Sequence, residues 1–149
     1  MSYYNLSSLY YKQGNIQEAK RMLEKAKNID DTHPMVNAQL ARIHCGAKEY
    51  DVAFSLYQTA LTRQPDSAYI HSNLAVCLLN GGKIKEGREE FFKAIILNPD
   101  EIDSYFFIGL SYDAEGDSTK ALYYYKQFAA RAPKDSPYMA GVTSRLQKN

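Results

Sequence analysis

The histidine and cysteine side chains are the best suited to chemistry, but their spacing forms no catalytic or metal-binding motif. Cys45 follows His44 directly, yet neighbouring residues of a helix point about 100° apart, so adjacency does not create a Cys–His pair. Cys45 and Cys77 have no paired spacing and no nearby ligand cluster, which predicts free, reduced thiols. No nucleophile–base pair or carboxylate pair has a local signature. We therefore expect no enzyme activity, cofactor or metal.

The 149 residues have the length of one domain, and we expect a single domain over residues 1–149. Eighteen Lys and Arg balance seventeen Asp and Glu, and the densest basic stretch, residues 83–93, interleaves glutamates, which argues against a nucleic-acid partner. No apolar run approaches the roughly 20 residues of a membrane-spanning helix. No secretory signal is visible, so we expect the cytoplasm, or the periplasm or another compartment if a signal has been removed.

A period of 34 residues runs through nearly the whole chain. One column holds small residues: Ala19, Ala53, Gly87 and Ala121. Another holds large apolar residues: Leu6, Leu40, Leu74 and Ile108. A turn signal divides each repeat into two helical blocks, at Gly14, Lys48, Gly82 and Gly116. Each repeat therefore predicts a helix pair that must bury its apolar face against its neighbours.

The repeat resembles the tetratricopeptide repeat, whose signature is an aromatic residue, Leu-Gly and Tyr in the first helix, then Ala, Phe and Pro. The fourth copy matches best, with Tyr105, Ile108, Gly109, Tyr112, Ala121, Tyr125 and Pro133. The resemblance implies an all-α fold, a right-handed superhelical solenoid of antiparallel helix pairs. The repeats lie at about residues 1–33, 34–67, 68–101 and 102–135.

The second and third copies are looser, because Asn37 and His71 occupy the aromatic position and His44 replaces the Tyr. Both histidines fall in columns that face the core. We expect them to be packed and hydrogen-bonded rather than catalytic.

Residues 136–147 are predicted to form a final capping helix. Ser136 suits the N-cap position and Pro137 the first helical position. Four apolar residues then share one face: Tyr138, Met139, Val142 and Leu146. The first repeat has no such cap, so we expect either a longer natural protein or a partner at that end.

The resemblance also implies that the first helices line a concave groove. Its apolar and aromatic positions concentrate in the third and fourth repeats: Tyr69, Val76, Leu79, Phe106 and Leu110. This lining predicts a docking site for an apolar peptide or helix with micromolar affinity. The alternative is that these side chains pack on neighbouring helices or on the capping helix.

A second groove column holds the amides of Asn5, Gln39 and Asn73 and is interrupted by Phe107. Such a column can hydrogen-bond the backbone of an extended peptide, and it resembles the asparagine ladder of protein O-GlcNAc transferases. The alternative is ordinary polar surface. Tyr4 is also a groove position.

The remaining groove positions of the first two repeats include Tyr11 and Arg42. Arg42 alone has the charge to bind a carboxylate. The basic clamp by which some related repeats grip the acidic C-termini of Hsp70 and Hsp90 is therefore missing.

The sequence thus predicts a non-catalytic adaptor that binds a peptide or helix of a partner protein. One alternative is a structural assembly factor, of the pilus or secretion type, that self-associates through its N-terminal repeat or through a convex face bearing Tyr123 or Tyr124. Another is the regulatory repeat portion of a larger enzyme.

Overall fold

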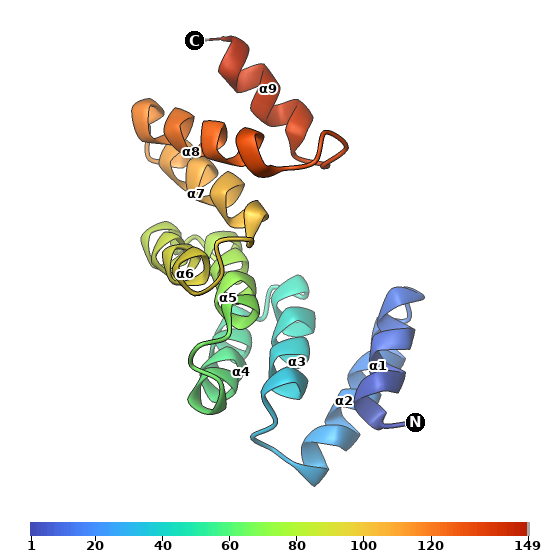
Figure 1. Cartoon of the computed structure of the whole chain (residues 1–149). Coiled ribbons are helices and arrows are strands. Elements are labelled where there is room, and N and C mark those ends of the chain that lie inside the picture. The colour runs from blue at the N-terminus through green and yellow to red at the C-terminus, as the bar shows by residue number, and fades with distance from the viewer. Residues whose placement is uncertain (149) are drawn as a thin grey trace.

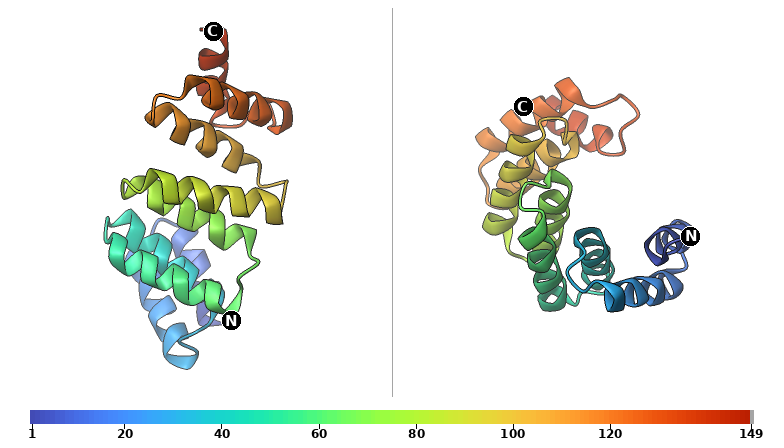
Figure 2. Two further views of the ribbon diagram at one scale, coloured as in Figure 1. Left: turned by 90° about the vertical axis from the view of Figure 1, so that its left-hand side faces the viewer. Right: turned by 60° about the horizontal axis from the view of Figure 1, so that its bottom comes forward.

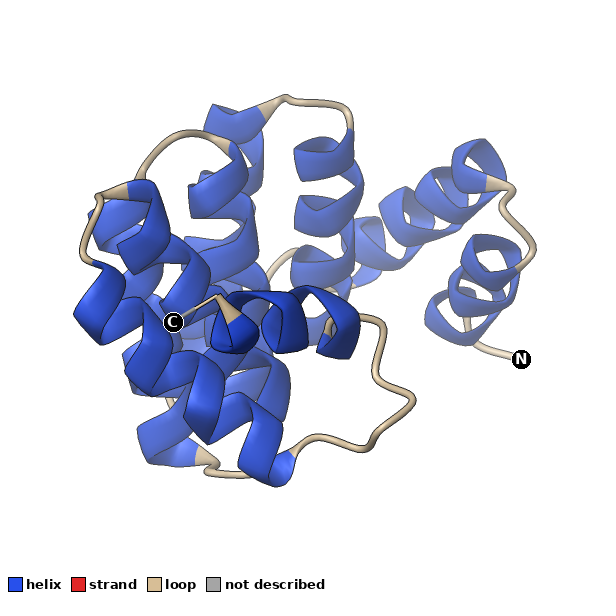
Figure 3. Ribbon diagram, turned by 90° about the horizontal axis from the view of Figure 1, so that it is seen from above, coloured by secondary structure: helices blue, strands red, loops and turns tan. Residues whose placement is uncertain are grey.

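The computed structural model describes residues 1–148, and over that range it consists of helices joined by short loops (Figures 1 and 3). The helices are α1 (Tyr3–Lys12), α2 (Ile16–Ile29), α3 (Pro34–Gly46), α4 (Tyr50–Arg63), α5 (Ala68–Asn80), α6 (Ile84–Leu97), α7 (Ile102–Ala114), α8 (Ser118–Arg131) and α9 (Met139–Gln147). The predicted all-α fold is confirmed.

The helices are arranged as four successive pairs followed by α9. Packing is most extensive within each pair, from α1 with α2 to α7 with α8, and each pair then stacks on the next. The stack curves into a C whose two ends are the N-terminal pair and α9 (Figure 2). The first helices of the pairs, α1, α3, α5 and α7, lie toward the inner side of this curve.

The turn inside each pair uses one residue in the left-handed region. The positive φ angles are 77° at Gly14, 82° at Gly82 and 79° at Gly116, and Lys48 takes the same place with φ 62°. Glycine adopts this conformation without the steric cost that a Cβ atom brings. The predicted turn positions are confirmed, and Lys48 is the only non-glycine residue with a positive φ among the described residues.

The residues that replace the family's aromatic position tie each repeat to the preceding loop. Asn37 Nδ2 donates to the Asp31 and His33 carbonyls at 2.8 and 3.0 Å. His71 Nε2 lies 2.7 Å from the Pro65 carbonyl, and its Nδ1 lies 2.6 Å from a Glu90 carboxylate oxygen. The structural role predicted for His71 is confirmed, because both ring nitrogens face acceptors inside the fold.

The core follows the stack in three apolar clusters. Small residues let the paired helices approach. A Cβ atom on Gly109 would lie 2.7 Å from the Tyr125 ring, and one on Gly87 would lie 3.0 Å from the Ala75 carbonyl oxygen. Gly87, like the alanines of its column, therefore serves close packing.

The capping helix α9 begins at Met139, three residues later than predicted. Ser136 is not its N-cap. Instead, the Ser136 carbonyl accepts from Met139 N at 3.0 Å, which closes a turn ahead of the helix. This turn carries the Tyr138 ring onto Phe106, with 4.5 Å between ring centroids. The predicted apolar face is confirmed, since Val142 is fully buried against α7 and α8.

Cys45 and Cys77 form a disulfide that joins α3 to α5, so the prediction of free thiols is wrong. Their Cα atoms are 5.8 Å apart, a normal spacing for a disulfide. The two residues are 32 positions apart, close to the repeat length, and lie on first helices that stack. The sequence places the cysteines on successive first helices but at different positions of the repeat, and the bond becomes evident only from the way α3 and α5 stack.

Candidate peptide-binding groove

The inner face carries a row of hollows between α5 and α7, where the sequence predicted the groove. The first, which we call the apolar pocket, has a volume of about 200 Å³. Its lining consists of Val76, Leu79, Asn80, Ile84, Phe107, Leu110, Ser111 and Ala114. Four predicted site residues therefore meet in one hollow: Val76, Leu79, Phe107 and Leu110. Ile84 was missed, because it starts a second helix and such helices were assigned to the outer side.

Phe107 also anchors this pocket to the core. Its ring is parallel to that of buried Phe91, with 5.3 Å between centroids. The Phe107 ring, which lines the pocket, is therefore packed from behind by a core residue.

Phe106 lies elsewhere, in the interface with the capping helix. Its ring stacks on Tyr138 and contacts the rings of Tyr125 and Phe128 at centroid distances of 6.1 and 5.8 Å. Phe106 thus packs as the alternative interpretation of the sequence described, and it does not line the apolar pocket.

The second hollow, which we call the Glu101 pocket, adjoins the apolar pocket and has a volume of about 230 Å³. Its lining consists of Tyr69, Ser72, Asn73, Val76, Phe91, Glu101, Asp103, Ser104 and Phe107. Glu101 was missed, because it precedes α7 and falls outside the groove positions of the repeat. Asp103 occupies the same repeat position as Tyr69, and that correspondence is the signal that places it here.

The amide column is not a free ladder. Gln39 Nε2 donates to the Tyr4 hydroxyl at 3.1 Å and to Ser8 Oγ at 3.3 Å, which joins α3 to α1. Asn73 Nδ2 donates at 2.7 Å to the Tyr69 carbonyl of its own helix. Asn5 is exposed. Two of the three side-chain amides, those of Gln39 and Asn73, therefore already donate hydrogen bonds within the protein.

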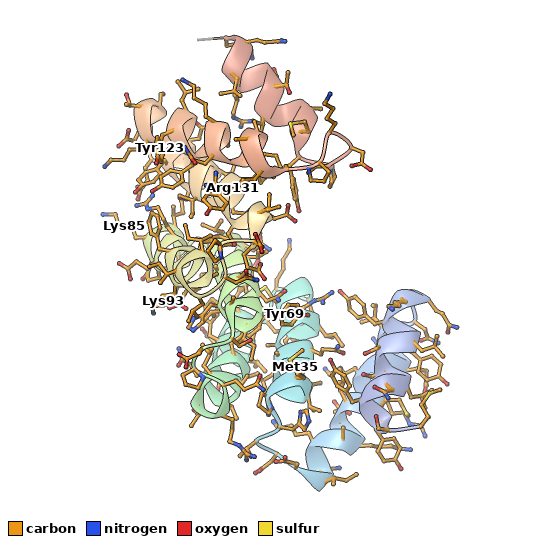
Figure 4. The ribbon with its side chains drawn as sticks, viewed as in Figure 1. Met35, Tyr69, Lys85, Lys93, Tyr123 and Arg131 are labelled. Carbon is orange, nitrogen blue, oxygen red and sulfur yellow. A yellow bond between two sulfur atoms is a disulfide. The ribbon has the colours of Figure 1, made fainter. Side chains whose placement is uncertain are left out.

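Arg42 bridges the second and third repeats along the inner face. Its Nη1 donates to the Tyr69 hydroxyl at 3.2 Å, and its guanidinium lies 4.7 Å from the centroid of the Tyr11 ring. Arg42 also lines a hollow of about 350 Å³ with Ser8, Tyr11, Lys12 and Gln39. Burial raises the pKa of the nearby Tyr4 hydroxyl, which keeps it neutral beside Gln39. The N-terminal part of the inner face is thus basic and aromatic. Figure 4 labels Tyr69, the residue of α5 that accepts the hydrogen bond from Arg42.

Comparison with known proteins decides the family. Tetratricopeptide repeat models match residues 2–33, 45–106 and 103–135. The chain belongs to the tetratricopeptide repeat family. The resemblance seen in the sequence is confirmed.

Two relatives are named for a biogenesis process and for organising chaperones. One is the cytochrome c-type biogenesis protein CycH of Bradyrhizobium diazoefficiens, 30% identical over 65% of this chain and 27% of the relative. The other is Hsp70-Hsp90 organizing protein 3 of Arabidopsis thaliana, 24% identical over 88% of this chain and 24% of the relative. The chain spans about a quarter of the length of each.

A solved structure shares the tetratricopeptide repeat architecture. MamA from Desulfovibrio magneticus RS-1 superposes with a TM-score of 0.79 at 18% identity, over 90% of this chain and 76% of that chain. The likeness supports the right-handed superhelical solenoid predicted from the sequence.

The outer face of the repeat stack carries an aromatic cluster on α6, α7 and α8. Tyr124 is half-buried, stacked on Tyr112 at 5.8 Å and edge-on to Phe92. Tyr123 is 57% exposed, and Figure 4 shows it far from Tyr69. Of the two tyrosines considered for the convex surface, Tyr123 is therefore the exposed one.

Within residues 1–148 no group of three or more His, Cys, Asp or Glu side chains is placed to hold a metal ion. Over the same residues, no helix has both the length and the apolar character needed to cross a bilayer.

Proposed function

We propose that the protein is a non-catalytic adaptor that binds a segment of a partner protein along the inner face, between α5 and α7. The observation that carries this proposal is the apolar pocket, which opens on the inner face with Val76, Leu79, Phe107 and Leu110 around it. Apolar side chains in a preformed hollow favour a complementary apolar group of a ligand.

The size of the pocket suits one side chain of a peptide. Burying a Leu- or Phe-sized side chain there contributes about 1.5–3 kcal/mol. Several further contacts and the cost of ordering the segment bring the expected affinity to the micromolar range, about −8 kcal/mol. An interaction of this strength is suited to reversible recruitment.

The relatives support a role in assembly. One is named for cytochrome c biogenesis and the other for organising chaperones, and in both the matched part is a fraction of a longer protein. The chaperone partners do not transfer to this chain, because the basic clamp is missing and Arg42 is engaged with Tyr11 and Tyr69.

The disulfide bears on the compartment in which the adaptor works. Disulfides persist in oxidising environments such as the periplasm and are rare in the cytosol. The Cys45–Cys77 bond therefore supports an oxidising compartment over the cytoplasm. Alkylation of accessible thiols at harvest, followed by intact mass measurement, checks this: protein isolated with both thiols alkylated speaks for the cytoplasm.

Self-association is a second candidate function, favoured by the 57% exposure of Tyr123 on the outer face. Sedimentation across a concentration series tests it. Oligomers that dissociate in a Tyr123→Ser variant support this candidate, and a monomer at all concentrations rejects it.

The adaptor proposal is tested by substitutions in the apolar pocket. We expect Leu79→Asp with Leu110→Asp to weaken binding of peptides selected from a random display library by tenfold or more, because a carboxylate replaces the apolar wall. Ile96→Asp is the matched control, since Ile96 is 78% exposed on α6. Circular dichroism confirms helicity in each variant. Phe106 is left intact, because changing it would disturb α9. Equal binding by the pocket variant and the wild type rejects the proposal.

A further inference from the structure

We infer that the Glu101 pocket receives a lysine or arginine side chain of the same partner segment whose apolar side chain occupies the apolar pocket. The inference rests on the proposed function and adds the chemistry of the partner. It follows from how the two pockets join, from the groups that line the Glu101 pocket, and from the charge beyond it.

The two pockets are continuous. Val76 and Phe107 line both, so they form a shared wall at the middle of the groove. Leu110 lies on one side of this wall and Asp103 on the other, seven residues apart on α7, or about 10 Å at the rise of an α-helix. An extended peptide covers that distance in about three residues. A segment anchored in the apolar pocket therefore brings a residue two to four positions away to the Glu101 pocket.

The lining of the Glu101 pocket suits a long cationic side chain. Val76 and Phe107 provide an apolar floor for an aliphatic stem, and the Phe107 ring also attracts a cation. The carboxylates of Glu101 and Asp103 lie at the start of α7, and the described residues that line the pocket include no lysine or arginine. The pocket thus offers apolar surface and negative charge together.

Its remaining polar groups are consistent with a donor ligand. Ser104 is 2% exposed, and its hydroxyl has no hydrogen-bond partner among the described residues. The Asn73 amide donates to the Tyr69 carbonyl, and the Tyr69 hydroxyl accepts from Arg42. The two carboxylates are consequently the acceptors at hand for an ammonium or guanidinium group.

The negative charge continues past this pocket. A neighbouring hollow of about 480 Å³ shares Glu101 and Asp103 and adds Asp100 and Asp135, with no lysine or arginine among its described lining residues. On the α5 side of the Glu101 pocket, the lining residue Tyr69 accepts a hydrogen bond from the cationic Arg42. The groove is therefore charged asymmetrically, which orients a segment with its basic residues toward the start of α7.

Asp103 also lies in the first turn of α7, where a carboxylate stabilises a helix by itself. The experiment therefore measures which peptides each variant binds, and not the stability of the variant. A random peptide display library is selected on the immobilised wild type, on Glu101→Lys with Asp103→Lys, and on Leu79→Asp with Leu110→Asp. The matched control is Glu86→Lys with Glu89→Lys, two exposed carboxylates of α6.

We expect wild-type selections to enrich an apolar residue followed or preceded by Lys or Arg at two to four positions. The Glu101 and Asp103 reversal removes that basic enrichment and weakens a wild-type peptide on the order of tenfold, more at low salt than at high salt. The control keeps both. If the reversed variant does not fold, Glu101→Gln with Asp103→Asn takes its place, with a smaller loss expected.

Two results overturn different claims. Selections that depend on Leu79 and Leu110 but show no Lys or Arg preference, or a preference that survives the charge reversal, overturn the cation pocket and leave the adaptor intact. Selections that do not depend on Leu79 and Leu110 overturn the proposed function, and the inference with it.

Discussion

Two buried tyrosines in the same repeat column differ in what their hydroxyl groups contact. The Tyr125 hydroxyl donates to Asp113 Oδ2 at 2.6 Å, and Arg145 Nε donates to the same oxygen at 2.7 Å from α9. The Tyr57 hydroxyl is buried with no hydrogen-bond partner among the described residues. Burial raises the pKa of both hydroxyls well above the ordinary value, so both stay protonated near neutral pH. One hydroxyl therefore stabilises the fold and the other costs free energy.

We expect Tyr57→Phe to raise the free energy of unfolding by about 1 kcal/mol, because it removes an unsatisfied buried hydroxyl. Phe91 holds the same column position in the third repeat and is buried there, so a phenyl ring suits this place. Tyr125→Phe should lower the free energy of unfolding by about 1–2 kcal/mol, because its hydrogen bond to a carboxylate is lost. Urea denaturation of both variants measures the difference. A destabilised Tyr57→Phe variant contradicts this account.

At the scale of single residues, the sequence predicts columns but not the partners within them. Phe106 and Phe107 are adjacent and both fall in groove columns, yet one packs on α9 and the other lines the groove. The Tyr138 ring covers Phe106, and it reaches this place only after the chain has turned. Gln39 was likewise predicted to face a ligand, and its amide bonds Tyr4 and Ser8 on the neighbouring helix.

At the scale of the helix pairs, the turn inside the second repeat is strained at Lys48. Three of the four pairs place glycine in this left-handed position, and Lys48 holds it with a Cβ atom. The left-handed conformation costs a non-glycine residue roughly 1–2 kcal/mol. Replacing Lys48 with glycine removes this cost, but the gain in stability is partly offset because glycine has more conformational freedom in the unfolded chain.

Lys48→Gly should therefore raise the free energy of unfolding by about 0.5–1 kcal/mol. The reciprocal change, Gly82→Ala, should lower it by about 1 kcal/mol, since a Cβ atom added at Gly82 meets no neighbouring atom and backbone conformation is the only cost. Thermal melts of the two variants check the pair. Lys48→Gly melting below the wild type would sink the argument.

Elements were predicted well wherever the repeat supplied several copies of a signal. The four turns recur at one spacing, so each copy supports the others. The start of α9 has no such support. Ser136 and Pro137 form a good local helix start, but packing of Tyr138 on Phe106 outweighs it and the helix begins at Met139.

At the scale of the whole molecule, the 34-residue period predicts the solenoid because every repeat buries its apolar face against its neighbours in the same way. The disulfide escaped prediction for a related reason. Cys45 and Cys77 are 32 residues apart and so occupy different positions of the 34-residue repeat. They meet only once α3 and α5 are stacked. The acidic side of the groove was missed because Glu101 comes from a connection between repeats.

The disulfide should stabilise the stack by restricting the unfolded chain. For a loop of this length, we expect reduction, or the pair Cys45→Ala with Cys77→Ala, to lower the free energy of unfolding by about 3–4 kcal/mol. Urea denaturation with and without reductant measures it. The double variant supplies the control, because reductant should leave its unfolding curve unchanged. A wild-type curve that does not respond to full reduction contradicts the prediction.

The same bond also governs how the protein responds to mechanical force. A repeat stack pulled from its ends gives way one repeat at a time, because each repeat is held only by its neighbours. The residues between Cys45 and Cys77 cannot be drawn out with the rest, since the disulfide carries the load past them. About 110 Å of chain, 32 residues at full extension, stays out of reach of the applied force. All of α4, the loop into α5 and α5 as far as Cys77 are thus shielded from tension, while the first and last repeats remain free to unravel.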